Sequence, residues 1–258
     1  GGACRDDIHV YANINRATRE DRSAETYARN AAAAVADGFD AIKIGAFDDL
    51  PRGIDSADEA RAGIERLRAV REAIGPDRDL LVDCHSHFTV KGALEVAREI
   101  ADVNLFWYEE PIPQDDYDGY LRVMAECGMP VAGGESRSHR RGWWEVLERQ
   151  ALHICMADVT VVGGIAELHK VAAMAAARGI PTAPHGPFGV VTTAASVHAM
   201  AAHPEFLILE YAWGETPWRA DLTLPRESIV DGRIPVPDAP GLGVELNPVV
   251  LEAHRLEN

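Results

Sequence analysis

The feature that most constrains the fold is a regular alternation of short β-rich runs with longer helical stretches. The strand-like runs are residues 8–14, 40–47, 79–85, 104–110, 129–135, 152–159, 180–186 and 206–211. The helical stretches between them are residues 26–39, 56–75, 92–103, 120–128, 143–150, 165–179 and 190–203. This pattern is typical of βα units around a parallel sheet. Eight strands and seven helices predict an α/β fold that closes into a (β/α)7β barrel.

The length of the chain fits one large barrel followed by a tail. A chain of 258 residues that is 47% hydrophobic can bury a single barrel core. From Thr216 onward the sequence becomes rich in Pro and Gly, which predicts an irregular C-terminal tail. We therefore expect a barrel over residues 1–215 and a tail over residues 216–258.

Charge and cysteine usage exclude several classes of protein. The chain has 41 acidic and 25 basic residues, and its net charge of −16 repels phosphate backbones and anionic lipid. We expect no nucleic-acid or membrane partner, and no apolar run reaches the roughly 18 residues of a membrane span. Cys4, Cys84, Cys127 and Cys155 form no CxxC pair, so a reducing cytosol is expected rather than a disulfide framework or a cysteine zinc site.

Three carboxylates close consecutive predicted strands at equal spacing. Asp83, Glu109 and Glu135 follow one another at intervals of 26 residues, which is one βα unit each. The carboxyl ends of barrel strands meet at one mouth, so these side chains should converge. Clustered carboxylates repel unless a cation neutralises them, and oxygen ligands favour Mg²⁺ or Mn²⁺ over Zn²⁺. Capping of the following helix explains any one of them equally well, but three at equal spacing favour a metal site.

Two histidines at strand ends are candidate acid–base groups. His185 follows the seventh predicted strand and Asp158 ends the sixth, so the two should lie within reach of each other. An Asp that bonds an imidazole fixes its tautomer and prepares it as a general base. Asp83 and His85 are two positions apart on one predicted strand and should face the same side. His85 is therefore predicted to stand beside the metal as an acid.

Lys43 and Glu210 complete the candidate site. Lys43 ends the second predicted strand, where its ammonium could hold a substrate carboxylate. A lysine that reaches from the barrel mouth to water is the alternative. Glu210 closes the eighth predicted strand, where its carboxyl group could stabilise an enediolate, although a cap or a tail anchor is also compatible with this position.

Two further motifs admit other interpretations. His85-Ser86-His87 has the HxH pattern of a zinc hydrolase of the amidohydrolase kind, but in such barrels that motif belongs on the first strand and here it falls on the third. Gly163-Gly164 precedes a predicted helix, where an anion could bind. A tight turn is the better explanation for two glycines without a longer fingerprint.

Together these motifs resemble the mandelate racemase branch of the enolase superfamily, in particular its acid-sugar dehydratases of the galactonate type. The resemblance is carried by the D-x-H of residues 83–85, the EEP of 109–111, the GE of 134–135, Asp158 with Gly163-Gly164, the PHGPFG of 184–189 and Glu210. It implies a modified TIM barrel in which Asp83, Glu109 and Glu135 hold Mg²⁺. It also implies that Asp158 and His185 form a dyad and that His85 protonates a leaving hydroxyl.

The chain departs from this pattern in two places. Lys43 falls on the first lysine of the K-x-K of the branch's racemases, and Gly45 falls on the second, which argues against two-base racemisation. The N-terminal α+β domain that caps such barrels is absent from the sequence, and the chain opens without an initiator Met. We expect that domain in the same gene product or in a separate chain, and we expect a homo-oligomer.

The resemblance implies a specific reaction on a small-molecule sugar acid. A Mg²⁺-dependent dehydratase would remove the proton α to the carboxylate and eliminate the β-hydroxyl to give a 2-keto-3-deoxy acid. An epimerase, racemase or cycloisomerase with the same metal and dyad is the first alternative. A barrel that binds a metabolite without catalysis is the second.

Overall fold

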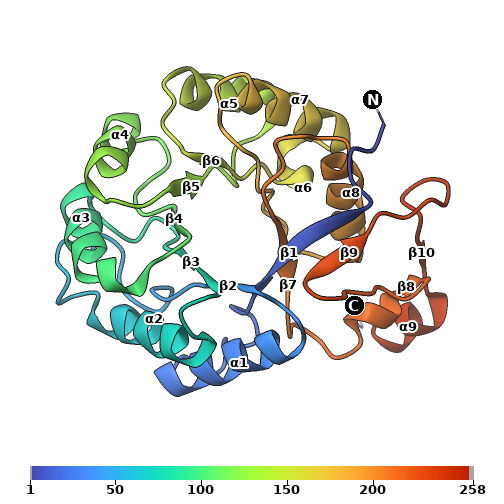
Figure 1. Cartoon of the computed structure of the whole chain (residues 1–258), viewed down its shortest axis with the longest axis horizontal. Coiled ribbons are helices and arrows are strands. Elements are labelled where there is room, and N and C mark those ends of the chain that lie inside the picture. Colours follow the sequence, from blue (N-terminus) through green and yellow to red (C-terminus); the bar gives the residue numbers. More distant parts are fainter. Residues whose placement is uncertain (1, 256–258) are drawn as a thin grey trace.

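The computed structural model describes residues 2–255, and its parallel strands close into a barrel that helices surround (Figure 1). The barrel strands are β1 (Asp7–Asn13), β2 (Ala41–Ile44), β3 (Asp79–Asp83), β4 (Trp107–Glu109), β5 (Val131–Gly133), β6 (Ile154–Cys155) and β7 (Leu209–Ala212). They pair in parallel in the order β6-β5-β4-β3-β2-β1-β7. The α/β barrel predicted from the sequence is therefore confirmed.

The predicted seventh strand is reduced to one bridging residue. Thr182 pairs in parallel with Cys155 of β6 and with Phe206 ahead of β7, and so closes the ring. Prolines at positions 181 and 184 flank this residue, and a proline has no N–H to donate to a strand ladder. The prediction of a full strand was wrong for this reason, although the ring closes where it was expected.

All seven predicted helices are present, with boundaries shifted by a few residues. They are α1 (Ala24–Ala36), α2 (Arg61–Ile74), α3 (Val90–Glu99), α4 (Tyr117–Glu126), α5 (His139–Glu148), α7 (Ile165–Ala176) and α8 (Val190–Ala201). The N-cap positions of α1, α3 and α4 are occupied by Ser23, Thr89 and Asp116. The side chain of each accepts a hydrogen bond from a backbone N–H in the first turn of its helix. The short helix α6 (Val159–Val162) and the 3-10 turn η1 (Ala101–Val103) were not predicted. Within residues 2–255, no helix combines the length and the apolar character needed to cross a bilayer.

Apolar side chains fill both faces of the barrel strands. One layer lies between the strands and the helices and includes Ile42, Val82 and Tyr108. The other fills the barrel interior with Tyr11, Ala41, Leu81, Trp107, Ala132, Ile154, Met156, Ala183 and Ile208. Since successive strand residues point to opposite faces, residues two positions further along share the inward face. The packed interior forms a floor, and the candidate site lies above it.

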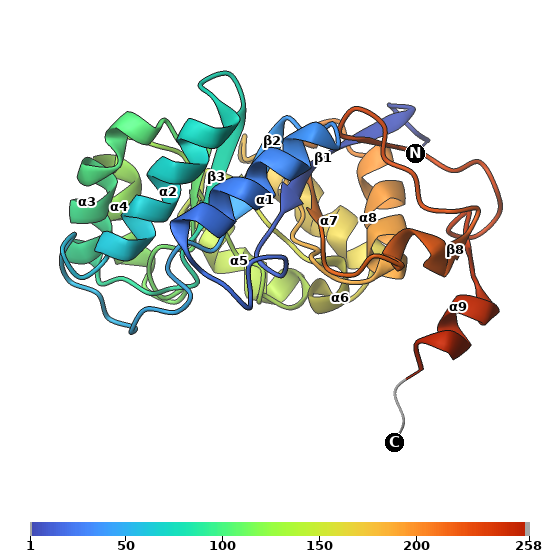
Figure 2. The same cartoon turned by 90° about the horizontal axis from the view of Figure 1, so that it is seen from below.

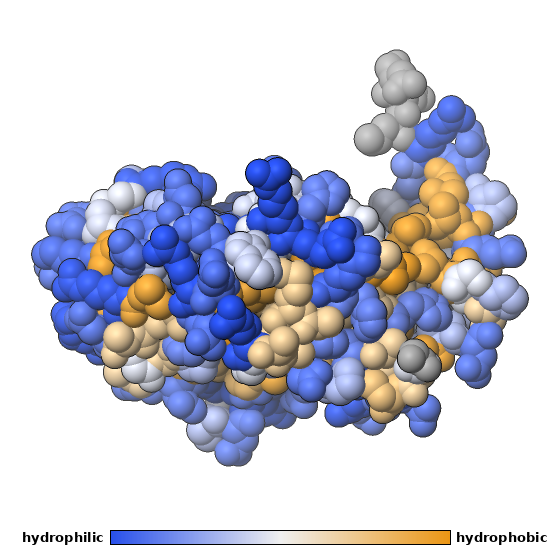
Figure 3. All heavy atoms as spheres, turned by 90° about the horizontal axis from the view of Figure 1, so that it is seen from above, coloured by the Kyte–Doolittle hydropathy of each residue, from blue (hydrophilic) through white to orange (hydrophobic). Residues whose placement is uncertain are grey.

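The tail after β7 contains short regular elements, so the expectation of an irregular segment was only partly right. They are η2 (Arg219–Leu222), β8 (Thr223–Leu224), β9 (Arg233–Pro235), β10 (Glu245–Leu246) and α9 (Pro248–Ala253). β9 pairs antiparallel with the first residues of β1, and β8 pairs with β10. Figure 2 shows α9 projecting from the barrel, and Figure 3 shows apolar surface at this end, where Leu224, Leu246 and Val249 are exposed.

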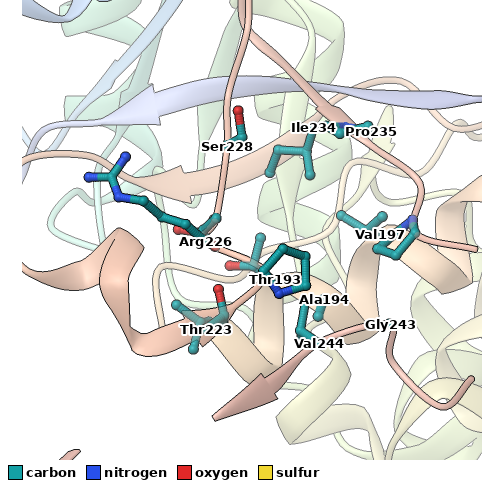
Figure 4. A pocket seen from close by; sticks show the side chains of 14 residues that line it. Thr193, Ala194, Val197, Thr223, Arg226, Ser228, Ile234, Pro235, Gly243 and Val244 are labelled. Carbon is teal, nitrogen blue, oxygen red and sulfur yellow. The ribbon is translucent and has the colours of Figure 1, made fainter. Parts of the chain in front are cut away.

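A cavity of about 190 Å³ lies between α8 and the tail (Figure 4). Ala194 and Val197 of α8 line one side, while Ile234 of β9 and Val244 line the side formed by the tail. The walls are predominantly apolar, and Asp83, Glu109 and Glu135 are not among the residues that line the cavity. The tail is thus joined to the barrel through β9 while it leaves a gap beside α8.

Candidate active site

Four predicted site residues form one layer above the barrel floor. Each of them lies two positions after a residue of the barrel interior. They are Lys43 after Ala41, Asp83 after Leu81, Glu109 after Trp107 and Glu210 after Ile208. All four side chains are almost completely buried. Glu210 was expected to close its strand, but β7 continues to Ala212, so this carboxylate points inward from within the strand.

Asp83, Glu109 and Glu135 come together as the sequence spacing predicted. Each offers one carboxylate oxygen, and these atoms lie within 4.8 Å of one another. Asp83 and Glu109 are the last residues of β3 and β4, whereas Glu135 lies two residues beyond β5. The intervening Gly134 has φ +100°, and a Cβ there would lie 2.3 Å from the ring of Trp143. The position of Glu135 therefore depends on a glycine at 134.

This acidic cluster has the chemistry of a site for a hard divalent cation. Oε2 of Glu135 is buried and has no hydrogen-bond partner among the described residues, although Nε2 of His185 lies 3.3 Å away. Burial, reinforced by the charge of Asp83, raises the pKa of Glu135 to about 7, and the same two causes raise the pKa of Glu109 well above its usual value. The carboxylates thus resist ionising together until more positive charge is supplied, and three oxygen ligands suit Mg²⁺ or Mn²⁺.

Lys43 supplies part of that positive charge. Its Nζ lies 2.8 Å from Oε1 of Glu109, 2.7 Å from Oε1 of Glu210 and 3.6 Å from Oδ2 of Asp83. Burial alone would lower the pKa of Lys43, but Glu109 and Glu210 outweigh it and raise that pKa well above its usual value. The alternative of a lysine that reaches from the barrel mouth to water was wrong, because the side chain is 0% exposed.

Asp158 and His185 form the predicted pair. Oδ2 of Asp158 lies 2.7 Å from Nδ1 of His185, and Oδ1 accepts hydrogen bonds from the backbone N–H groups of Thr160 and Val161. Asp158 lies beyond β6 and begins α6, so it caps a helix and orients a histidine at once. Burial alone would lower the pKa of His185, but Glu210 and Asp158 raise it to about 9.

His85 reaches the same mouth by a route that the sequence did not predict. The strand ends at Asp83, and His85 follows it with φ +43° rather than continuing the strand. Its Nε2 lies 3.0 Å from Oδ2 of Asp83, and its Nδ1 lies 2.6 Å from Oδ1 of Asp48. The charge of Asp83 is the largest of the effects that raise the pKa of His85 to about 12. The two histidines thus flank the acidic cluster from different sides.

Three residues of the site were missed. Trp107 donates from Nε1 to Oε2 of Glu109 over 2.9 Å, and Asn13 donates from Nδ2 to Oε1 of Glu210 over 2.7 Å. Strand periodicity could have found Trp107, which lies two positions before Glu109 on the same face. Asp48 lies in a loop, and no periodic signal in the sequence marked it.

The other motifs do not form sites of their own. Nδ1 of His87 lies 2.8 Å from the backbone carbonyl of Cys84, and within the described residues the acidic cluster is the one group arranged to hold a metal. The amidohydrolase interpretation of the HxH motif is therefore not supported. Gly163 and Gly164 have φ of +112° and +95° and join α6 to α7, as expected of a tight turn.

The fold and the site define a parallel α/β barrel with an acidic cluster and two histidines at the carboxyl ends of its strands. The chain belongs to the enolase C-terminal domain-like family, whose sequence model matches residues 26–250. The resemblance predicted from the motifs is thereby confirmed. A mandelate racemase/muconate lactonizing enzyme-like protein from Rubrobacter xylanophilus superposes over 100% of this chain and 71% of its own, with a TM-score of 0.91 and 33% identity.

Curated relatives include dehydratases and a cycloisomerase. The D-xylonate dehydratase of Haloferax volcanii is 34% identical over 267 residues, which cover 100% of this chain and 64% of that protein. The D-gluconate dehydratase of Thermoproteus tenax is 31% identical over 100% of this chain and 51% of its own length. The D-galactarolactone cycloisomerase of Agrobacterium fabrum is 34% identical over 99% of this chain and 67% of its own. The chain thus spans about half to two thirds of the length of these relatives.

Proposed function

We propose that the protein is a Mg²⁺-dependent dehydratase, with Mn²⁺ as a possible substitute, that converts a sugar acid into a 2-keto-3-deoxy acid. The observation that carries this proposal is the placement of two histidines around one acidic cluster, His185 beside Glu135 and His85 beside Asp83. An α,β-elimination needs a base for the α-proton and an acid for the leaving hydroxyl. The names of the xylonate and gluconate dehydratases support the substrate class.

The protein would use its own side chains to hold and move the protons. Asp83, Glu109 and Glu135 would hold the cation, which when bound supplies positive charge for a substrate carboxylate. His185 takes the α-proton, and the electron pair moves into the carboxylate as an enediolate. Lys43 would stabilise that charge as a cation, and Glu210 would do so only when it is protonated, since an ionised carboxylate repels an enediolate. When the electron pair returns from the enediolate, the bond to the β-hydroxyl breaks and His85 gives the departing oxygen a proton, so that water is released. The other product is an enol, which tautomerises to the keto acid.

His185 must be neutral to act as the base. Its pKa of about 9 reflects the charge of Glu210, the hydrogen bond to Asp158 and the charge of Glu135, which together outweigh burial. Additional positive charge at the acidic cluster would lower this pKa toward neutrality. Asp158 keeps the ring oriented through Nδ1, so Nε2 faces the cluster.

A cycloisomerase or epimerase is the second candidate, because one relative is a D-galactarolactone cycloisomerase. Such an enzyme would share the metal ligands and His185 but would not expel water. The mass of the product distinguishes the two, since dehydration lowers it by one water. Gly45 leaves no lysine on the opposite face for a second base.

The experiment that tests the proposal is a substrate screen with the protein as its gene encodes it. Hexonates, pentonates and aldarates are incubated with Mg²⁺, and 2-keto-acid formation is measured. We expect a 2-keto acid to form, and we expect both chelation of the metal and the substitution His185→Asn to abolish its formation. Turnover without mass loss would replace the proposal with the isomerase, and Mg²⁺ binding without any turnover would favour a non-catalytic barrel.

Glu135→Gln is expected to weaken Mg²⁺ and Mn²⁺ binding by at least about 100-fold. Loss of a residue that only hydrogen-bonds to a metal ligand can already lower metal affinity by up to about 100-fold, and loss of a ligand should cost at least as much. The amide keeps the size of the side chain but removes a charged oxygen that has no hydrogen-bond partner. Isothermal titration calorimetry with each metal measures the effect. Glu145→Gln, on the exposed face of α5, is the control, and an unchanged affinity in Glu135→Gln would remove Glu135 from the ligand set.

We propose that the protein works in a reducing cytosol, where its four cysteines would stay free thiols. We propose that an N-terminal capping domain, in the same gene product or in a separate chain, covers the mouth and that residues 216–258 pack on the barrel or on that domain. A homo-oligomer and the absence of nucleic-acid and membrane partners remain part of this proposal.

A further inference from the structure

Asp48 lies beside His85, in the loop between β2 and α2, and has no role in the steps above. Its Oδ1 lies 2.6 Å from Nδ1 of His85, and its Oδ2 accepts a hydrogen bond from Arg22 over 3.2 Å. The Asp48 side chain is 16% exposed. The carboxylate is therefore held from two sides, with one oxygen committed to the imidazole.

The backbone of His85 is fixed independently of its ring. His85 and Ser86 both have positive φ, at +43° and +58°, which non-glycine residues adopt rarely. The N–H of Ser86 donates to the carbonyl of Glu110 over 2.7 Å, and Arg52 donates to the carbonyl of His85 over 2.7 Å. These hydrogen bonds fix the backbone at His85 and therefore the position of its Cβ. The orientation of the imidazole ring must be fixed by other contacts.

Gly45 makes room for Asp48. A Cβ at position 45 would lie 2.5 Å from Oδ2 of Asp48 and 2.9 Å from its Cγ and Oδ1. The φ of Gly45 is not in the left-handed range, so space rather than backbone freedom requires glycine there. Its N–H donates to the side chain of Asn15 and its carbonyl accepts from the hydroxyl of Tyr27, so the backbone is held in place.

We propose that Asp48 is a positioning residue for the elimination step, which it serves by accepting a hydrogen bond from Nδ1 of His85 and so directing Nε2 toward the acidic cluster. This inference rests on the proposed function and deepens it. The pair has the same form as Asp158 with His185, in which a carboxylate holds Nδ1 and leaves Nε2 facing the cluster. One dyad serves removal of the α-proton and the other serves departure of the hydroxyl. A side chain at position 45 would displace the carboxylate of this second dyad.

The test separates the two halves of the reaction in the protein as its gene encodes it. In D₂O with Mg²⁺, exchange of the α-proton of the sugar acid reports His185, whereas keto-acid formation reports both histidines. Asp48→Ala and Gly45→Ala are expected to lower keto-acid formation about 10- to 100-fold, as removal of an outer partner of a functional group does, while α-proton exchange stays within about twofold and KM does not change. Asp48→Asn, which keeps an acceptor oxygen, should restore part of the rate.

Asp49→Ala is the matched control, because that carboxylate pairs with Arg66 rather than with His85. Equal loss of exchange and elimination in Asp48→Ala, or no loss of either, would overturn the inference. Nitrogen NMR of the histidine rings provides a readout that does not need turnover. The His85 signals should change in Asp48→Ala while those of His185 stay in place. Absence of both exchange and elimination in the unmodified protein would count against the proposed function, and unchanged His85 signals would count against the role of Asp48.

Discussion

His185→Asn is expected to lower α-proton exchange and keto-acid formation together, each by about 10²- to 10⁴-fold. His185 is the histidine that Asp158 orients, and its Nε2 faces Glu135 and Glu210. Without it, the reaction would lose the base to which we assign the α-proton, and elimination depends on that first step. Deuterium incorporation and keto-acid release, measured in one D₂O reaction, report both losses.

The comparison with His85→Asn makes this result specific. That variant should lose keto-acid formation but keep exchange, because the proton leaves and returns through His185. His169→Asn, on the exposed face of α7, controls for the loss of any histidine. Retention of exchange in His185→Asn would assign the base to another residue.

Lys43→Met is expected to lower the free energy of unfolding by about 3–5 kcal/mol when no divalent cation is present, the usual cost of breaking a buried ion pair by removing one partner. Lys43 is the cation that lies between Glu109 and Glu210, and all three side chains are fully buried. Methionine has a similar length but leaves the carboxylates without their partner. Urea denaturation in the presence of a chelator measures the loss.

Saturating Mg²⁺ should narrow that difference, because a divalent cation compensates the same carboxylates and binds the folded state. Lys91→Met, at a position whose side chain is 60% exposed, is the control and should change stability by less than about 1 kcal/mol. An equal loss of stability with and without Mg²⁺ would mean that Lys43 contributes packing rather than charge.

Most of the fold follows from periodicity that is visible in the sequence. The alternation of strand-like and helical runs predicted the barrel, and the seven main helices lie where it placed them. The errors have local causes. Prolines at 181 and 184 limit the predicted seventh strand to a bridge at Thr182. The Pro- and Gly-rich tail contains a strand because β9 pairs with the first residues of β1.

The candidate site was predictable to the extent that its residues lie on strands. Asp83 and Glu109 end parallel neighbours, so chain geometry alone brings them together. Lys43 was placed correctly on its strand, but its burial was not foreseen, because burial depends on partners from other strands. Asp48 and the left-handed turn at His85 belong to loops, whose conformation is set by contacts distant in sequence.

The crowding at position 45 also couples that position to position 48 in the effects of mutation. A lysine introduced at Gly45 would push the carboxylate of Asp48 away from His85, since even a Cβ lies 2.5 Å from its oxygen. A variant with lysine at position 45 would thus lose the hydrogen bond from His85 to Asp48. The effect of a side chain at position 45 should therefore depend on the residue at position 48, and a double-mutant cycle of the two positions should show this coupling.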